Sequence, residues 1–178
     1  FSTETWKEIP SDNCPFEEKP RMKADLITDE AINAIDSGLY DFIRINFPNG
    51  DMVGHTGVMP AVIKSVEAVD DNIGRLIKAL QDVGGVLVCS ADHGNADDMV
   101  QLDKKINELM RDKEGNLLMK TAHSLNPVPV YVYDTSETAN VRIANVDNPG
   151  ISSLAATCIV MLGFEVPENY TPSLVDVG

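Results

Sequence analysis

The apolar run GVLVCSA, residues 85–91, constrains the fold more than any other part of this sequence. A run whose positions are all apolar or small is typical of a strand that is buried on both faces of a sheet. The segment before it, Met59–Val83, repeats apolar residues at helical spacing and is followed by Gly84 and Gly85, which are expected to end a helix. A long helix that leads directly into a buried strand predicts an α/β fold.

Other strand and helix patterns alternate on either side of this pair. They predict a helix over 28–37 with Thr28 and Asp29 as N-cap residues, a strand over 40–47, a loop over 48–57, a charged helix within 99–116, a strand over 128–133 and a helix over 152–163. The alternation predicts an α/β fold with a mostly parallel sheet. We expect the sheet to be incomplete, because about three strands are recognised where ~5–6 are usual.

Charge and cysteine content restrict the partners and the compartment. The chain has 14 basic and 28 acidic residues and a formal net charge of -14, so it is not expected to bind nucleic acid or an anionic membrane surface. A phosphorylated ligand would require a local reversal of this charge, which bound metal ions provide. Three widely spaced cysteines and the absence of a signal-peptide pattern predict a reducing, cytoplasmic location.

All three histidines of the chain lie near the ends of predicted strands. His55 follows Asp51 by four residues, His93 follows Asp92 directly after the GVLVCSA strand, and His123 precedes the strand over 128–133. Because ligands bind beyond the carboxyl ends of the strands in such sheets, these residues are expected to meet. Imidazole and carboxylate ligands together suit Mn²⁺, Zn²⁺, Fe²⁺ or Co²⁺ better than Ca²⁺.

Structural roles compete with this interpretation for several residues. Alone, the Asp51-x3-His55 pattern fits a turn aspartate with a surface histidine, and His123 fits a turn residue before a proline-rich stretch. Asp97 and Asp98 are interpreted as residues of a helix N-terminus rather than metal ligands. Neither Ser90 nor Ser124 lies in a G-x-S-x-G motif, so a nucleophilic serine elbow is not indicated.

Three motifs, NFPNGDMVGHTG, SADHGNADDMV and TAHSLNPVPV, together with the ending GISSLAATCIVMLGFEVPENYTPSLV, resemble the cofactor-independent (2,3-bisphosphoglycerate-independent) phosphoglycerate mutases. This family belongs to the alkaline phosphatase superfamily, so the resemblance implies an alkaline-phosphatase-like three-layer α/β/α fold with a mostly parallel sheet, incomplete in this chain. The resemblance covers the chain from about Pro20 onward. It implies interconversion of 3-phosphoglycerate and 2-phosphoglycerate in glycolysis and gluconeogenesis, through a phosphoserine intermediate at a site with two Mn²⁺ ions (or Co²⁺ or Mg²⁺) and without bisphosphoglycerate.

The resemblance also implies roles for particular residues. Asp51, His55 and His123 match the ligands of one metal ion, and Asp92 and His93 match ligands of the second. The serine nucleophile, a further Asp ligand and the substrate-binding arginines of the family have no counterpart in these residues, so no catalytic residue is assigned and the substrate-binding residues are unknown.

We therefore expect the chain to be the C-terminal part of a longer enzyme. Residues 1–24 would form an extended segment leading in from a missing N-terminal part, and 25–178 would form the C-terminal part of the metal-binding, phosphatase-like domain. The chain alone is expected to be inactive. Two alternatives stay open: another enzyme of the superfamily, such as a phosphopentomutase or a phosphodiesterase, and a metal-binding module without catalysis.

Overall fold

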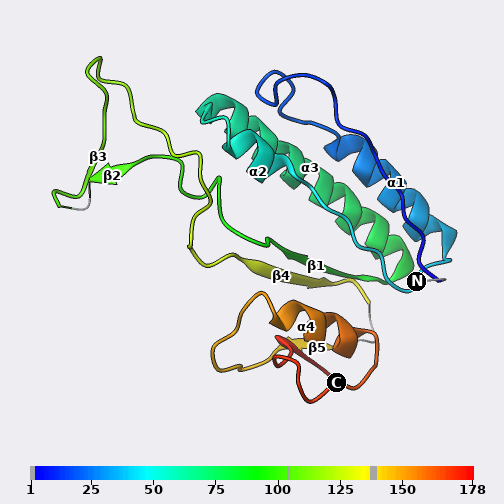
Figure 1. Cartoon of the computed structure of the whole chain (residues 1–178). Helices are drawn as coiled ribbons and strands as arrows, with labels where there is room; N and C mark the ends of the chain where they lie inside the picture. Colours follow the sequence, from blue (N-terminus) through cyan, green and yellow to red (C-terminus); the bar gives the residue numbers. More distant parts are fainter. Residues whose placement is uncertain (1–2, 104, 137–139) are drawn as a thin grey trace.

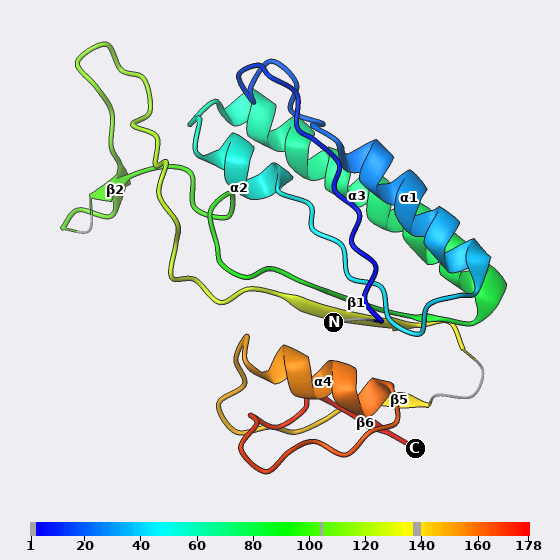
Figure 2. The ribbon, with the colours of Figure 1, turned by 45° about the vertical axis from the view of Figure 1, so that its right-hand side comes forward.

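Helices and short strands alternate along the chain in the computed structural model, which describes residues 3–103, 105–136 and 140–178. In chain order the elements are α1 (Ala24–Ser37), α2 (Asn49–Gly54), α3 (Met59–Val83), β1 (Val86–Ser90), β2 (Leu102–Asp103), β3 (Glu108–Leu109), β4 (Val130–Asp134), β5 (Val141–Ile143), α4 (Ser153–Met161) and β6 (Val175–Val177). The β1–β4 ribbon lies between α1 and α3 on one side and α4 on the other (Figures 1 and 2). The predicted α/β class is confirmed.

The direction in which the strands pair differs from the prediction. β1 and β4 are antiparallel, with Val86 opposite Asp134 and Ser90 opposite Val130. The pairs β2–β3 and β5–β6 are antiparallel as well, so the expected mostly parallel pairing is not found among the described residues. A parallel pair needs a crossover that returns the chain to the end from which it came. Between β1 and β4 the chain instead passes through an outlying arm that carries β2 and β3 (Figure 1), and it then runs back beside β1.

Helix α3 has the bounds that the sequence predicts, and it ends at Gly84, whose φ is +71°. The buried face of α3 is not formed mainly by its large apolar side chains. The buried positions are mainly small or polar and include Ser65, Ala68 and Asn72, whereas Val66 is 48% exposed. Small side chains allow two helices to approach closely, and α1 packs along α3 in both views (Figures 1 and 2).

Polar contacts join α1 to α3. Arg21, just before α1, bonds Asp25 at 2.8 Å and Asp71 of α3 at 3.0 Å. The amide of Asn72 donates to the Asp25 carboxylate at 2.9 Å. α1 begins at Ala24, four residues before the predicted start, so Thr28 is a buried residue inside the helix rather than its N-cap.

The predicted helix within 99–116 is wrong, because this stretch forms the short hairpin β2–β3 on the outlying arm. Local polar contacts favour turns: the Asp103 carboxylate accepts a hydrogen bond from the Lys105 amide, and Asn107 adopts a φ of +55°. Leu109 is 50% exposed, and none of the described residues over 101–120 is buried. Most helical stability in proteins comes from packing of an apolar face, which these residues do not provide.

Two predictions before α3 are also wrong. Residues 40–47 are not assigned as a strand, because they have no ladder partner among the described residues, and β propensity alone does not supply one. Within the predicted loop over 48–57, residues Asn49–Gly54 form the short helix α2. Asn49 is fully buried, and its side-chain amide donates to the backbone carbonyls of Pro20 and Arg21 at 3.1 and 3.0 Å. This contact fixes α2 against the N-terminal segment.

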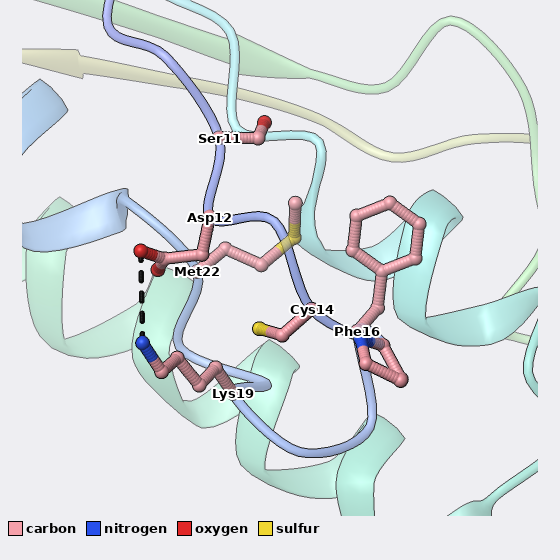
Figure 3. Close-up of a pocket in the computed structure, with 7 residues that line it drawn as sticks. Ser11, Asp12, Cys14, Phe16, Lys19 and Met22 are labelled. Carbon is pink, nitrogen blue, oxygen red and sulfur yellow. Dashed lines mark ion pairs between the residues drawn. The ribbon is translucent and has the colours of Figure 1, made fainter.

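The N-terminal segment is anchored by its own side chains. No helix or strand is assigned in residues 3–23. Figure 3 shows Asp12 paired with Lys19, 3.6 Å apart, around a hollow of about 10 Å³ that Cys14, Phe16 and Met22 also line. That volume is at the lower limit for one water molecule, so the hollow is packing space rather than a ligand site. Phe16 and Met22 pack against the buried cluster formed by Val53, Ala61, Val62 and Met99.

The C-terminal part packs α4 on β6, which pairs with β5. α4 confirms the predicted helix over 152–163, although Ser152 makes no side-chain capping bond. The buried Thr157 donates its hydroxyl to the carbonyl of Ser153 at 2.8 Å and accepts from the amide of Leu174 at 2.9 Å, which fixes the chain before β6 to the helix. No helix among the described residues has both the length and the apolar character to cross a membrane.

Candidate metal centre

The helical turn α2 places Asp51 and His55 on one face. Residues four positions apart are neighbours on a helix surface, and the backbone amide of His55 donates to the carbonyl of Asp51 at 3.0 Å. The side chains converge as well, with 3.1 Å between His55 Nε2 and Asp51 Oδ1. The turn of helix absent from the sequence prediction therefore brings these two groups together.

His123 completes a triad with these two residues from the segment that precedes β4. Its Nε2 atom lies 3.0 Å from Asp51 Oδ1 and 3.1 Å from His55 Nε2. Asp51 is about one-third exposed, and the two imidazoles are somewhat more so. Three potential ligand atoms thus form a small triangle that opens to solvent, an arrangement that can hold a metal ion.

The surroundings fix the orientation of two members of the triad. His55 Nδ1 lies 2.5 Å from the backbone carbonyl oxygen of Thr121, which can only accept. His55 therefore carries its proton on Nδ1 in that contact and presents the lone pair of Nε2 toward the triangle. Asn95, which is 5% exposed, donates its side-chain amide to Asp51 Oδ1 at 2.9 Å.

The charge of Asp51 reflects these contacts. Burial raises the pKa of its carboxyl group, but the hydrogen bond from Asn95 and the three nearby imidazoles together lower that pKa below its usual value. Asp51 is therefore held as a carboxylate at neutral pH. An ionised carboxylate is the form that binds a metal ion.

Asp92 and His93, the other predicted pair, lie beside the triad but are less tightly gathered. The His93 ring stacks on His123, with centroids 3.8 Å apart and an interplanar angle of 17°. His93 Nε2 is 4.0 Å from Asp51 Oδ1 and 3.7 Å from Asp92 Oδ1. The Asp92 side chain is 87% exposed. The structure brings four of the five predicted residues into one cluster and leaves Asp92 at its rim.

Further residues support the cluster from the loop after β1. Asp97 and Asp98 do not begin a helix, contrary to the prediction. Asp97 accepts hydrogen bonds from Ser124 and Asn126, and Asp98 pairs with Lys120. Sequence reasoning also missed Asn95, although its place two residues after His93 in the DHGN motif was an available signal.

An open hollow of about 560 Å³ adjoins the triad at His123 and is also lined by Lys120 and Asn126. Lys120 is the one Lys or Arg among the described residues of its lining, and its charge is paired with Asp98. The hollow therefore offers little net positive charge of its own. An anionic ligand placed there would depend on cations held by the triad.

Comparison with known proteins gives this cluster a context. Residues 1–166 match the Metalloenzyme superfamily, so the chain belongs to that superfamily. It is 51% identical over 176 residues to the 2,3-bisphosphoglycerate-independent phosphoglycerate mutase of Trypanosoma brucei brucei, which covers 98% of this chain and 32% of that protein. A protein of the same name from Mesembryanthemum crystallinum is 44% identical over 176 residues, which is 98% of this chain and 31% of the relative.

The fold is similar to that of a solved structure as well. Phosphoglycerate mutase from Leishmania mexicana, solved at low cobalt concentration, matches with a TM-score of 0.92 and 50% sequence identity, over 98% of this chain and 32% of that one. The resemblance to phosphoglycerate mutases that the three motifs predict is confirmed. The chain spans about a third of the length of these relatives.

Proposed function

We propose that Asp51, His55 and His123 bind one divalent metal ion in a 2,3-bisphosphoglycerate-independent phosphoglycerate mutase, of which this chain forms a part. The observation that carries the proposal is the convergence of three electron-pair donors within 3.1 Å of one another. In the tautomer that carries its proton on Nδ1, His55 directs the lone pair of Nε2 toward the Asp51 carboxylate, so that both groups can bind one cation.

The donor set fits a divalent ion of the first transition series. Ligand atoms that each lie ~2.1 Å from one ion are about 3.0–3.4 Å apart, and the three atoms here are separated by 3.0–3.1 Å. Two imidazoles and one carboxylate suit Mn²⁺, Co²⁺ or Zn²⁺ better than Ca²⁺. Mn²⁺ is the ion that we propose, because the resemblance to the mutases implies it.

A second ion is proposed at Asp92 and His93. These two residues offer an exposed carboxylate and an imidazole stacked on His123. Two ligands hold an ion weakly, so the second site requires groups from outside these residues. We propose that residues 25–178 belong to the metal-binding domain, that 1–24 lead into it, and that another part of the same protein supplies the remaining Asp and the serine.

The chemistry that follows is transfer of a phosphoryl group between the two hydroxyls of a phosphoglycerate. Divalent ions at this site supply a lowered pKa for a coordinated hydroxyl and neutralise charge on the phosphoryl oxygens. The chain's own contribution is positional. Asn95 holds the Asp51 carboxylate and the Thr121 carbonyl holds the His55 ring, both beside His123, which itself lines the hollow. Because no nucleophilic serine is assigned here, we propose that the chain alone does not turn over substrate.

The test is a coupled assay of 3-phosphoglycerate conversion with the complete protein that contains these residues. We expect turnover that is lost with a chelator, restored by Mn²⁺, and abolished by His123→Ala. The matched control is Asp112→Asn, because Asp112 bonds only within its own turn on the distant arm. Conversion of pentose phosphates in place of phosphoglycerate, or full activity of the His123→Ala variant, would overturn the proposal.

A further inference from the structure

We propose that Asp97 is a positioning residue for the metal site, because its carboxylate fastens the loop that carries His93 to the segment that carries His123. The inference rests on the proposed metal site and adds to it a residue that donates no ligand atom to the triad. From the sequence, Asp97 is expected at the N-terminus of a helix, but no helix begins there among the described residues.

The fastening consists of three hydrogen bonds across the two segments. The Ser124 hydroxyl donates to Asp97 Oδ2 at 2.8 Å, and the Asn126 side-chain amide donates to the same oxygen at 2.7 Å. The backbone amide of Ser124 donates to the carbonyl of Gly94 at 2.8 Å. The partners are 27 to 30 residues apart in the sequence, so these bonds join two loops that are not otherwise neighbours along the chain.

Each end of this fastening is next to a proposed metal ligand. Gly94 follows His93, and Ser124 follows His123, so the fastening sets the separation of the two imidazoles. Their rings stack with centroids 3.8 Å apart. If the loops separated, His123 Nε2 would leave its place 3.0 Å from Asp51 Oδ1. The position of a ligand on a loop depends on such outer contacts, whose loss typically reduces metal affinity about 10–100-fold.

The packing at Gly94 shows how closely the two segments approach. A Cβ atom at this position would overlap the hydroxyl of Ser124 and would lie 2.6 Å from Asp97 Oδ1. Only a residue without a side chain leaves room for this contact. The loops are thus in direct contact at the place where Asp97 binds both donors.

A second link keeps the loops near each other when Asp97 is changed. Asp98 pairs with Lys120, three residues before His123. The core residue Met99 is 5% exposed and continues the same loop into the buried cluster. Replacing Asp97, which is itself exposed, should therefore loosen the histidine pair without unfolding the chain.

Hydrogen bonding can be separated from charge at this position. Both donors bind the same oxygen, Oδ2, so an asparagine with its amide oxygen in that place can accept both bonds without the negative charge. We expect Asp97→Asn to retain Co²⁺ affinity within about threefold. Asp97→Ala removes both bonds, and we expect it to weaken Co²⁺ binding about tenfold or more.

The experiment is a titration of the chain with Co²⁺, followed by the visible absorption of the bound ion, which reports its ligands and geometry. His123→Ala tests the site itself, and Asp112→Ala is the control for loss of one carboxylate far from the site. Equal binding by His123→Ala and the unchanged chain would overturn the proposed metal site. Loss of binding in His123→Ala with unchanged affinity and spectrum in Asp97→Ala would overturn the positioning role alone.

Two further results decide the mechanism of Asp97. If Asp97→Asn is as weak as Asp97→Ala, the carboxylate acts through its charge and the positioning role is wrong. Ser124→Ala removes one of the bonds while Asp97 stays in place, so it replaces Asp97→Ala should that variant lose its far-ultraviolet circular dichroism. We expect about a threefold or larger loss of affinity for Ser124→Ala, and a smaller effect of Asp97→Ala when Ser124 is already alanine. Additive effects would contradict the inference.

Discussion

Replacing Asn95 with alanine should weaken both the fold and the metal site. Asn95 is 5% exposed and donates to the Asp51 carboxylate at 2.9 Å and, more weakly, to the Asp51 carbonyl at 3.3 Å. A hydrogen bond to a charged group contributes about 1.5–3 kcal/mol. Asn95 Oδ1 is buried without a partner among the described residues, and its removal offsets about 1 kcal/mol of that loss. We therefore expect Asn95→Ala to lower the free energy of unfolding by about 0.5–2 kcal/mol.

The assay is urea unfolding of the metal-free chain followed by circular dichroism, together with a Co²⁺ titration of the folded protein. The expected loss of Co²⁺ affinity is about 10–100-fold, because Asn95 is an outer contact of a proposed ligand. Asn116→Ala is the matched control: its amide donates to the Asp112 carboxylate at 3.1 Å, but on the exposed arm. The reasoning is refuted if Asn95→Ala and Asn116→Ala behave alike in both measurements.

Two other predictions concern the α1–α3 contact. Arg21 lowers the pKa of Asp25 from 3.8 to about 2, aided by Asn72, so this contact stabilises the fold above pH 3.8 and is lost as the pH falls toward 2. Because Asp25 is half exposed, we expect Arg21→Ala to lower stability slightly at pH 7 and to have almost no effect once the pH is below 2. Urea unfolding at several pH values measures this cost, and a pH-independent cost would contradict it. Ala68→Leu should overpack a fully buried position and destabilise by about 1–3 kcal/mol, whereas the exposed Val66→Leu should change stability by less than about 0.5 kcal/mol; equal thermal midpoints for the two variants would contradict this.

The sequence predicts those elements whose signals are local. Met59–Val83 has a first-turn Pro60 and a terminal Gly84, and the structure gives the same bounds. The apolar run that contains β1 is recognised as a strand from its composition, but the predicted burial on both faces is wrong, because all five residues of β1 are only partly buried. The helix predicted within 99–116 was wrong because its charged composition and the turn residues Gly115 and Asn116 fit a hairpin as well as a helix, and the turn contact of Asp103 favours the hairpin.

The candidate site could be predicted as a set of residues but not as an arrangement. Asp51, His55 and His123 are recognisable by residue type and by their motifs, although the strand predicted before Asp51 is not assigned, and the structure gathers their ligand atoms within 3.1 Å. Their supporting contacts join segments far apart in the sequence, such as Asn95 with Asp51 across 44 residues. No local pattern encodes such a pairing, so the partners of Asn95 and Asp97 emerge only from the folded chain.

The central claim is that one divalent ion binds among Asp51, His55 and His123, and anomalous X-ray diffraction from crystals grown with Co²⁺ or Mn²⁺ tests it most directly. We predict an anomalous peak ~2.0–2.3 Å from Asp51 Oδ1, His55 Nε2 and His123 Nε2. We also predict that the peak disappears in crystals of His123→Ala. An absence of anomalous density at the triad, or a peak that survives His123→Ala in the same place, would contradict the account.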